Sequence, residues 1–290
     1  MSDALDLEAF RSLVLERGRE LYRDFPWRRT RDPYAVWISE VMLQQTQTTR
    51  VDGRWQRWLA RFPTPAALAA ADPADVLDEW QGLGYNRRAL ALHRAARAVC
   101  ESGGALPEDA AALEALPGIG PATAAGIRAF AFDLHSVYLE TNVRAVFLHE
   151  LFPREERVAD RELLPLVRQT CPADASDPAD DPRTWYYALL DYGAYLKRTV
   201  PNPSRRSSAH TRQSRFEGSH RQKRAELLRV LLAHRENVAG GVDFETICGE
   251  LASAEQKAGR SALGAADVRA LLEELATEGF CRQANGVWTV

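Results

Sequence analysis

The stretch that decides the fold is Leu116-Pro117-Gly118-Ile119-Gly120, near the middle of the chain. Segments with helical periodicity flank it on both sides, over Glu108–Ala115 and Ala122–Ala131. Two glycines one residue apart allow positive φ and let the backbone approach a ligand closely. The second helix would present free N–H groups and the positive end of its dipole to an anion. We therefore predict a turn that binds a phosphate through Leu116, Gly118, Ile119, Gly120 and Thr123. The alternative is an ordinary tight turn between two helices.

The composition of the chain sets limits on the class of protein. It has 290 residues, of which 46% are hydrophobic, enough to form the cores of two or three domains. Its apolar runs are short and interrupted, and its acidic N-terminus lacks the features of a signal peptide. We therefore expect a cytoplasmic protein with no membrane partner. The net charge of −3 does not exclude nucleic acid, because the distribution of charge matters more than the total.

The cysteines give no sign of a metal centre. Cys100, Cys171, Cys248 and Cys281 are far apart and form no CxxC pattern, and the six histidines do not pair at metal-ligand spacing. In a cytosolic chain we expect four reduced thiols and no metal site.

Helical periodicity dominates the chain, and the sequence predicts an all-α fold. Asp32-Pro33 is typical of a helix start, with Asp as N-cap and Pro at the first helical position, and that helix is expected to run to about Arg50. Other helices are expected over Leu5–Arg23, Val51–Phe62, Pro65–Ala71, Pro73–Gln81, Asn86–Glu101, Asn142–Leu151, Asp160–Thr170, Pro182–Lys197, Glu226–His234, Phe244–Ala254 and Ala265–Glu278.

The composition divides the chain into three parts, 1–200, 201–224 and 225–290. The middle part has almost no aliphatic residues, and we interpret it as a basic linker or loop. Its Arg205, Arg206, Arg212 and Arg215 are candidates for phosphate contacts; a solvated, flexible linker is the alternative. The last part predicts three helices and a hairpin turning at Asn285-Gly286, as in a winged helix. Its ten acidic against six basic residues make it a weak DNA reader, and we expect a packing or protein-contact role.

Three motifs give the sequence a family resemblance. They are Phe25-Pro26-Trp27-Arg28, the helix segment Pro33–Gln47 containing SEVMLQQTQ, and Gly82-Leu83-Gly84-Tyr85. Together with the Leu116–Gly120 turn, they resemble the MutY family of adenine DNA glycosylases, a branch of the helix-hairpin-helix (endonuclease III-like) superfamily. The match covers roughly Phe25 to Ala194.

The resemblance implies a fold and a reaction. The fold would be a two-lobed, all-α helix-hairpin-helix glycosylase over residues 1–200, with double-stranded DNA in the cleft and a winged-helix-like domain after it. The reaction would be base excision repair, by hydrolysis of the N-glycosidic bond of an adenine mispaired with 8-oxoguanine or guanine. The base must be flipped out, because the bond is not reachable within the stacked duplex. We expect a monomer associated with the nucleoid.

Glu40 is the candidate general acid. It shares a helical face with Val36, Trp37 and Gln44, and a carboxyl on a largely apolar face is desolvated, which raises its pKa and favours the protonated form. Such a group can deliver a proton to a departing base. The resemblance implies that Glu40 protonates adenine N7. The alternative is an ordinary, half-exposed helix acid.

Glu140 is the candidate second carboxylate. The family has Asp before a Gly-Asn-Val segment, whereas this chain reads Glu140-Thr141-Asn142-Val143. The resemblance implies that Glu140 stabilises the sugar cation, and that Asn142 holds Glu140 or water. The extra methylene lengthens the arm by about 1.5 Å, so a shifted backbone or altered activity is expected. Glu140 as a mere helix N-terminal acid is the alternative.

Other site residues follow from the same resemblance. Lyase-type relatives carry a catalytic Lys where this chain has Ala122, so we predict a monofunctional glycosylase.

Gln44, Gln45 and Tyr85 are candidates to fill the gap left by the flipped base, although Tyr85 could instead cap a helix packing site. Arg28 and Trp27 are candidates to line the base pocket, or else form a core Trp beside a surface Arg.

Two family features are missing from the sequence. Lys197, Ser204, Ser207 and Gln213 stand roughly where the family has the four Cys ligands of a [4Fe–4S] cluster, so we predict no cluster and no cofactor. Residues 225–290 are too short for the family's Nudix-like domain, which leaves the opposite-base preference open.

Two other functions stay open as well. One is a pyrimidine glycosylase acting on uracil derivatives or thymine, and the other is a catalytically decayed DNA-binding module.

Overall fold

The computed structural model describes residues 6–173, 175–208, 215–236 and 241–290. Its contacts divide the chain into two units. The first unit consists of Met1–Ala69 and Arg94–Thr211, and the second of Ala70–His93 and Arg212–Val290. Across the described residues, no helix is long and apolar enough to cross a membrane.

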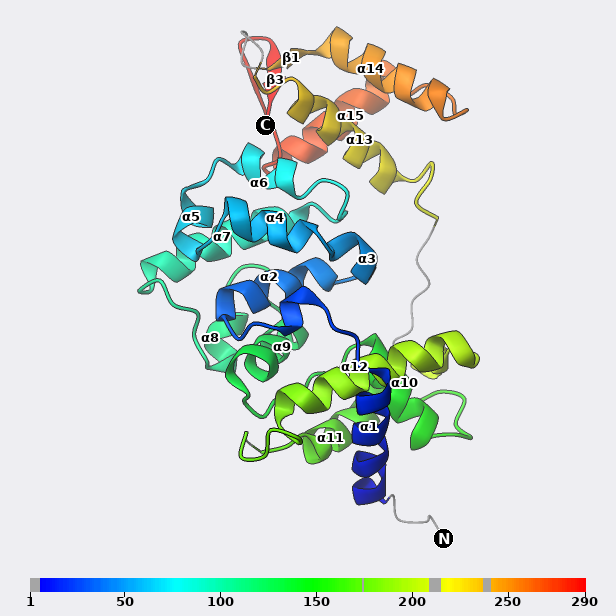
Figure 1. Cartoon of the computed structure of the whole chain (residues 1–290). Coiled ribbons are helices and arrows are strands. Elements are labelled where there is room, and N and C mark those ends of the chain that lie inside the picture. The colour runs from blue at the N-terminus through cyan, green and yellow to red at the C-terminus, as the bar shows by residue number, and fades with distance from the viewer. Residues whose placement is uncertain (1–5, 174, 209–214, 237–240) are drawn as a thin grey trace. The chain divides into compact units, whose positions relative to one another are not determined.

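The first unit is helical, as the sequence predicts (Figure 1). Its elements are α1 (Leu7–Leu21), the short 3-10 helix η1 (Pro26–Arg28), α2 (Pro33–Leu43), α3 (Thr48–Val51), α4 (Arg54–Arg61), α5 (Pro65–Ala70), α8 (Ala110–Glu114), α9 (Pro121–Phe132), α10 (Thr141–Glu150), α11 (Asp160–Thr170), α12 (Pro182–Thr199) and the 3-10 helix η2 (Pro203–Arg206). Helix α7 (Arg87–Glu101) begins in the second unit and continues into the first.

The core of the first unit lies where α1, α10 and α12 pack together. The ring of Phe10 on α1 meets Phe147 of α10 at 4.9 Å and Trp185 of α12 at 6.1 Å, both edge to face. Gly18 lets α1 approach α12 closely, since a Cβ there would lie 2.3 Å from the Cβ of Ala188. These three helices form a rigid base for the loops that carry polar residues.

Helix α2 starts where the sequence predicts and ends early. Asp32 caps it, accepting a hydrogen bond from the Tyr34 N–H at 3.0 Å. The expected end at Arg50 is wrong, because the helix stops at Leu43 and the chain turns at Gln45, which has a φ of 52°. A short helix, α3, follows. No glycine or proline marks this turn, so no local signal predicts it.

The predicted turn between two helices is confirmed. Helices α8 and α9 flank it, and Gly118 has a φ of 79°, which favours glycine. Ile119 is buried and donates its N–H to the carbonyl of Leu116 at 3.1 Å. Gly120 occupies the N-cap of α9 with extended backbone. The turn at 116–120 is therefore anchored by the buried side chain of Ile119, while Gly118 and Gly120 stay exposed.

The second unit combines helices with a small sheet. It contains α6 (Pro73–Glu79), α13 (His220–Ala233), α14 (Phe244–Lys257), α15 (Ala265–Thr277) and the strands β1 (Val242–Asp243), β2 (Arg282–Ala284) and β3 (Val287–Thr289). The strands are antiparallel in the order β1-β3-β2, with Val242 opposite Trp288. The predicted hairpin at Asn285-Gly286 is present, with positive φ at both residues. Strand β1 was not predicted, and the winged-helix assignment stays a prediction.

The described residues of the basic stretch 201–224 include regular elements, unlike the expected linker. Its start forms η2, and Ser207 pairs with Val158 in an isolated parallel bridge. Helix α13 begins at His220, before the expected Glu226, because the side chain of Ser219 caps it. The structure also groups Ala70–His93 with the C-terminal part, whereas the sequence placed that segment in the glycosylase domain.

Candidate active site

Glu40 lies near the end of α2, where α9 comes unusually close. A Cβ at Gly126 of α9 would lie 2.3 Å from Oε2 of Glu40, so the glycine makes the room that the carboxyl occupies. The hydroxyl of Tyr138 donates a hydrogen bond to the same Oε2 at 3.1 Å. Tyr138 is buried and packs edge to face against Phe130 and Tyr186. The Glu40 carboxyl is thus held from two sides by the first unit.

Glu140 is the N-cap of α10. Its Oε1 accepts hydrogen bonds from the N–H groups of Asn142 at 2.5 Å and Val143 at 3.1 Å. Burial raises the pKa of Glu140, while these two N–H groups and the charges of Lys197 and Arg144 oppose the rise. A carboxylate in an N-cap satisfies free helix donors and benefits from the helix dipole. The longer arm of Glu is therefore accommodated by folding back onto the helix end.

The charge of Glu140 affects the ionisation of Glu40. Burial raises the pKa of Glu40 to about 8, with the hydrogen bond from Tyr138 acting against the rise, the charge of Glu140 adding to it and Arg28 opposing it. Glu140 therefore lies near enough for its charge to act on Glu40, and the raised pKa favours the protonated form of Glu40 at neutral pH.

Helix α12 closes the site beside Glu140. The Lys197 ammonium donates a hydrogen bond to Oδ1 of Asn142 at 3.0 Å. One turn earlier, Gly193 lies so close to α10 that a Cβ there would meet the Asn142 carbonyl oxygen at 2.2 Å. Asn142, singled out from the sequence, is thus fixed through its backbone N–H and its side chain at once.

Arg28 lies in the interior and not at the surface. Its guanidinium forms a two-pronged pair with Asp191 of α12, at 2.6 and 2.9 Å, and stacks over Tyr187 at 4.3 Å. The neighbouring Trp27 is buried and stacks on Phe25 at 4.8 Å. Of the alternative, a core Trp beside a surface Arg, the core position of Trp27 is confirmed and the surface position of Arg28 is wrong; a part for both residues in lining the base pocket stays a prediction. Arg28 still acts on the site, because its charge opposes the rise in the pKa of Glu40.

The remaining candidate site residues of the first unit lie on the segment after α2 and at the start of α9. The amide of Gln44 donates to the Thr123 hydroxyl at 2.7 Å, which ties the end of α2 to the first turn of α9. Gln45 is exposed in its left-handed turn, and Ala122 is exposed at the start of α9. Gln44 and Thr123 were predicted as separate contacts; the structure joins them.

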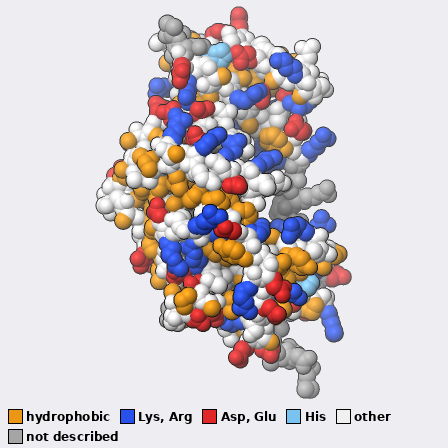
Figure 2. Space-filling model, in the orientation of Figure 1, with side chains coloured by type: hydrophobic (Ala, Val, Ile, Leu, Met, Phe, Trp, Pro, Cys, Tyr) orange, Lys and Arg blue, Asp and Glu red, His pale blue; other side chains and the backbone are white. Residues whose placement is uncertain are grey.

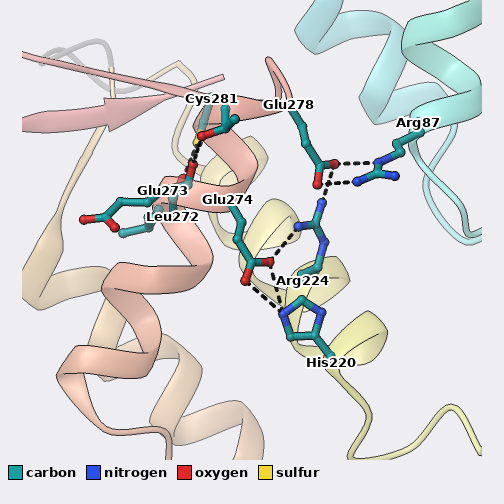
Figure 3. Close-up of polar contacts among 9 residues, drawn as sticks. Arg87, His220, Arg224, Leu272, Glu273, Glu274, Glu278 and Cys281 are labelled. Carbon is teal, nitrogen blue, oxygen red and sulfur yellow. Dashed lines mark hydrogen bonds and ion pairs between the residues drawn. The ribbon is translucent and has the colours of Figure 1, made fainter.

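Tyr85 belongs to the second unit, where it is 40% exposed and has a φ of 50°. Arg221 of α13 donates a hydrogen bond to its hydroxyl at 2.9 Å, and Arg88 lies 5.5 Å over its ring. The adjacent Arg87 pairs with Glu278 at 2.5 Å, and Glu278 also accepts from Arg224 at 2.6 Å (Figure 3). The C-terminal helices thus support the segment that carries Tyr85.

The basic residues of 201–224 have different surroundings. Arg206 donates to the backbone carbonyls of Leu148, Phe152 and Glu155, so it ties η2 to the end of α10. Arg205 and Arg215 are exposed, and Arg212 lies outside the described residues. Figure 2 shows basic side chains interspersed with acidic ones over the face in view. Phosphate contacts by Arg205, Arg212 and Arg215 stay a prediction, and Arg206 has a structural role.

The positions of the family's cluster ligands do not fit a [4Fe–4S] group in this chain. The ammonium of Lys197 is engaged with Asn142. Ser204 is buried and bonds to Asn202 at 2.8 Å, and Ser207 is buried as well. Gln213 lies outside the described residues. In the described part of the chain, no group of three or more His, Cys, Asp or Glu could hold a metal ion. A hydroxyl and an ammonium are poor substitutes for thiolates.

Three residues that contact the candidate site residues were not predicted. Tyr138, Gly126 and Asp191 were not among the predicted site residues. Their proximity to Glu40 and Arg28 depends on contacts between segments far apart in the chain. The Asp191-Tyr192-Gly193-Ala194 motif was the one available signal for Asp191.

Comparison with known proteins places this arrangement in a family. Residues 38–247 match the model of the HhH-GPD superfamily base excision DNA repair proteins. The chain is 36% identical to the adenine DNA glycosylase of Mycolicibacterium smegmatis over 228 residues, which covers 72% of this chain and 75% of that protein. It is 35% identical to the adenine DNA glycosylase of Mycobacterium tuberculosis over 233 residues, covering 73% of this chain and 75% of that protein.

A solved structure supports the fold. A thermostable thymine-DNA glycosylase superposes with a TM-score of 0.56 at 24% identity, covering 65% of this chain and 86% of that one. At this identity the likeness speaks for the fold alone. Taken with the sequence relatives and the geometry around Glu40 and Glu140, it leads to one conclusion: the chain belongs to the HhH-GPD superfamily of base excision DNA repair glycosylases, and its relatives there include adenine DNA glycosylases.

Proposed function

We propose that this chain is a monofunctional adenine DNA glycosylase, which hydrolyses the N-glycosidic bond of an adenine flipped out opposite 8-oxoguanine or guanine. The observation that carries the proposal is the Glu40 carboxyl, whose pKa is raised to about 8 beside the second carboxyl of Glu140. Two carboxyls with separated roles, one protonated and one ionised, are what acid-assisted departure of a base requires.

The proposed reaction divides the work between the two carboxyls. Glu40, protonated at neutral pH, gives its proton to N7 of adenine while the bond from C1′ to N9 breaks and its electron pair leaves with the base. The ionised Glu140 stabilises the positive charge that develops on the sugar. Water then adds to C1′, and its proton returns to the carboxyl pair. The products are free adenine and an intact abasic site.

Tyr138 and Arg28 tune this division. The hydroxyl of Tyr138 donates to Oε2 of Glu40, so it stabilises the carboxylate that remains after the proton has gone. Arg28 acts in the same direction through its charge. Burial keeps the proton on Glu40 before the reaction, and these two groups stabilise the product state. Glu40 is therefore set up to release its proton during bond cleavage.

The absence of strand cleavage and of an iron–sulfur cluster also belongs to the proposal. Ala122 has no amine to attack the sugar, so no covalent enzyme–DNA adduct is expected. The residues at the ligand positions do not suit iron. We expect a colourless monomer that works in the cytoplasm at the nucleoid and needs no cofactor.

A panel of duplexes tests the proposal. Single-turnover excision would be measured by alkaline cleavage on duplexes with adenine opposite 8-oxoguanine, guanine or cytosine, and with uracil or thymine opposite guanine. Glu40→Gln, which keeps the size of the side chain, is the control for chemistry. Product from adenine mispairs with wild type and none with Glu40→Gln is expected. Product from pyrimidine targets alone would overturn the adenine assignment, and no product on any duplex would support a decayed module.

Borohydride trapping tests the absence of lyase chemistry on the same duplexes. A glycosylase that uses water leaves nothing to trap, because no Schiff base forms between protein and sugar. A trapped adduct in wild-type protein would contradict this part of the proposal, even if adenine were released.

A further inference from the structure

Two residues of α12, Gly193 and Lys197, lie one helical turn apart and both contact Asn142 at the start of α10. Residues four apart share a face of a helix. Gly193 brings the two backbones together, because any Cβ there would lie 2.2 Å from the Asn142 carbonyl oxygen and 2.6 Å from its carbon. That close approach puts the Lys197 side chain within reach of the Asn142 amide.

A continuous chain of hydrogen bonds runs from Lys197 to Glu140. The Lys197 ammonium donates to Oδ1 of Asn142 at 3.0 Å, and the N–H of Asn142 donates to Oε1 of Glu140 at 2.5 Å. Lys197 is partly buried, and its hydrogen bond goes to a neutral amide, so that contact leaves its positive charge in place. The charge acts on Glu140 and favours its ionised form.

The other charged groups near Glu140 act differently. Arg144, on α10 itself, pairs with both oxygens of Asp160 at 2.9 and 2.8 Å, so much of its charge is balanced. The charge of Glu140 acts on Glu40 of α2, and the Tyr138 hydroxyl donates a hydrogen bond to Glu40. Neither Glu40 nor Tyr138 supplies a positive charge. Among the described residues, Lys197 is a cation that reaches the Glu140 cap through Asn142, and its hydrogen bond there is to a neutral amide and not to an acid.

We propose that Lys197 is a positioning residue for catalysis, which holds Asn142 and the Glu140 cap in place and sets a positive charge beside the carboxylate that stabilises the sugar cation. The proposal rests on the function proposed above. It gives a role to a residue that stands where the family is expected to have a cluster cysteine. In this chain that position has become part of the active site.

Two readouts test the proposal, one of them independent of activity. The first is a carbon-13 titration of the Glu140 carboxyl in glutamate-labelled protein, assigned with Glu140→Gln. The second is the pH dependence of single-turnover excision at saturating enzyme. The variants are Lys197→Met, Lys197→Gln and Lys197→Arg. Arg198→Met is the matched control, because it removes the same charge from the next residue, which is exposed.

The proposal predicts distinct outcomes for the variants. Lys197→Met should raise the pH at which Glu140 ionises, and the acidic limb of excision with it, by about one unit, the scale for losing a charge at this range. Its maximal rate should fall about tenfold, because Asn142 loses its anchor. Lys197→Gln should show the same shift with a smaller loss of rate, since it keeps a donor. Lys197→Arg should restore both, and Arg198→Met should change neither.

The possible failures are distinguishable. If wild type excises a base but Lys197→Met and Arg198→Met have the same Glu140 titration and acidic limb as wild type, the proposal for Lys197 is wrong. If wild type excises nothing while the Glu140 titration still shifts in Lys197→Met, the proposed function fails and the coupling of Lys197 to Glu140 stands. Thermal melting of each variant separates loss of fold from either result.

Discussion

Gly126→Ala is the sharpest test of the site around Glu40. The added Cβ would lie 2.3 Å from Oε2 of Glu40, 3.0 Å from its Cδ and 3.1 Å from Cε2 of Tyr138, whereas ordinary contacts begin near 3.4 Å. The flexible end of Glu40 is the easiest part to move, so its carboxyl must shift by about 1 Å. A shift of that size can cost on the order of 10²-fold in rate.

Stability should change in the opposite direction, which makes the result diagnostic. Gly126 lies inside α9, and replacing a helical Gly by Ala favours the helix by up to about 1 kcal/mol. We therefore expect a variant that melts at or above the wild-type temperature yet excises adenine about 100-fold more slowly in single-turnover assays. A general loss of folding cannot produce that combination.

A matched control exists in the second unit. Gly249 lies inside α14, and a Cβ there meets nothing within 4 Å. Gly249→Ala should gain similar helix stability and leave excision unchanged. If Gly126→Ala excises adenine as fast as wild type and Gly249→Ala, then the space beside Gly126 does not hold a reacting carboxyl, and the reasoning about Glu40 is refuted.

Three further predictions follow from the same geometry. In the proposed reaction the protonated form of Glu40 is the active one; because its pKa is raised to about 8, excision should fall as pH rises through about 8, and a flat profile from pH 7 to 9 would contradict this. Asp191→Asn leaves the buried Arg28 charge uncompensated and should cost about 3–5 kcal/mol of unfolding free energy in urea titrations; a cost under about 1 kcal/mol would count against the pair as a structural anchor. Arg221→Met removes the hydrogen bond to Tyr85 and should reduce the fluorescence rise of 2-aminopurine placed at the target base, whereas an unchanged rise would remove Tyr85 from base flipping.

Local signals in the sequence predicted the parts of the fold that local physics controls. Asp32-Pro33 marked the start of α2, and the two glycines of 116–120 marked the turn before α9. Both depend on capping and backbone freedom, which are properties of a few neighbouring residues. The end of α2 was missed because Gln45 adopts positive φ without the residue type that normally announces it.

The site was predictable only where motifs named its members. Glu40 and Glu140 came from their sequence context, and the charge of Glu140 acts on Glu40. The ion pair of Arg28 could not be predicted because its partner, Asp191, lies 163 residues away, and a buried ion pair leaves no local pattern. The same holds for Gly126 and Tyr138, whose importance depends entirely on packing against Glu40.

Helix α12 carries three contacts that must keep their relative angles around the helix axis. Asp191 binds Arg28, Gly193 admits the backbone of α10, and Lys197 reaches Asn142. A single inserted residue between Asp191 and Lys197 would rotate everything beyond it by about 100° about that axis. Such an insertion would separate the Lys197 contact with Asn142 from the Asp191 contact with Arg28, without changing Glu40 or Glu140. Sequence length in this helix is thus constrained as tightly as residue identity.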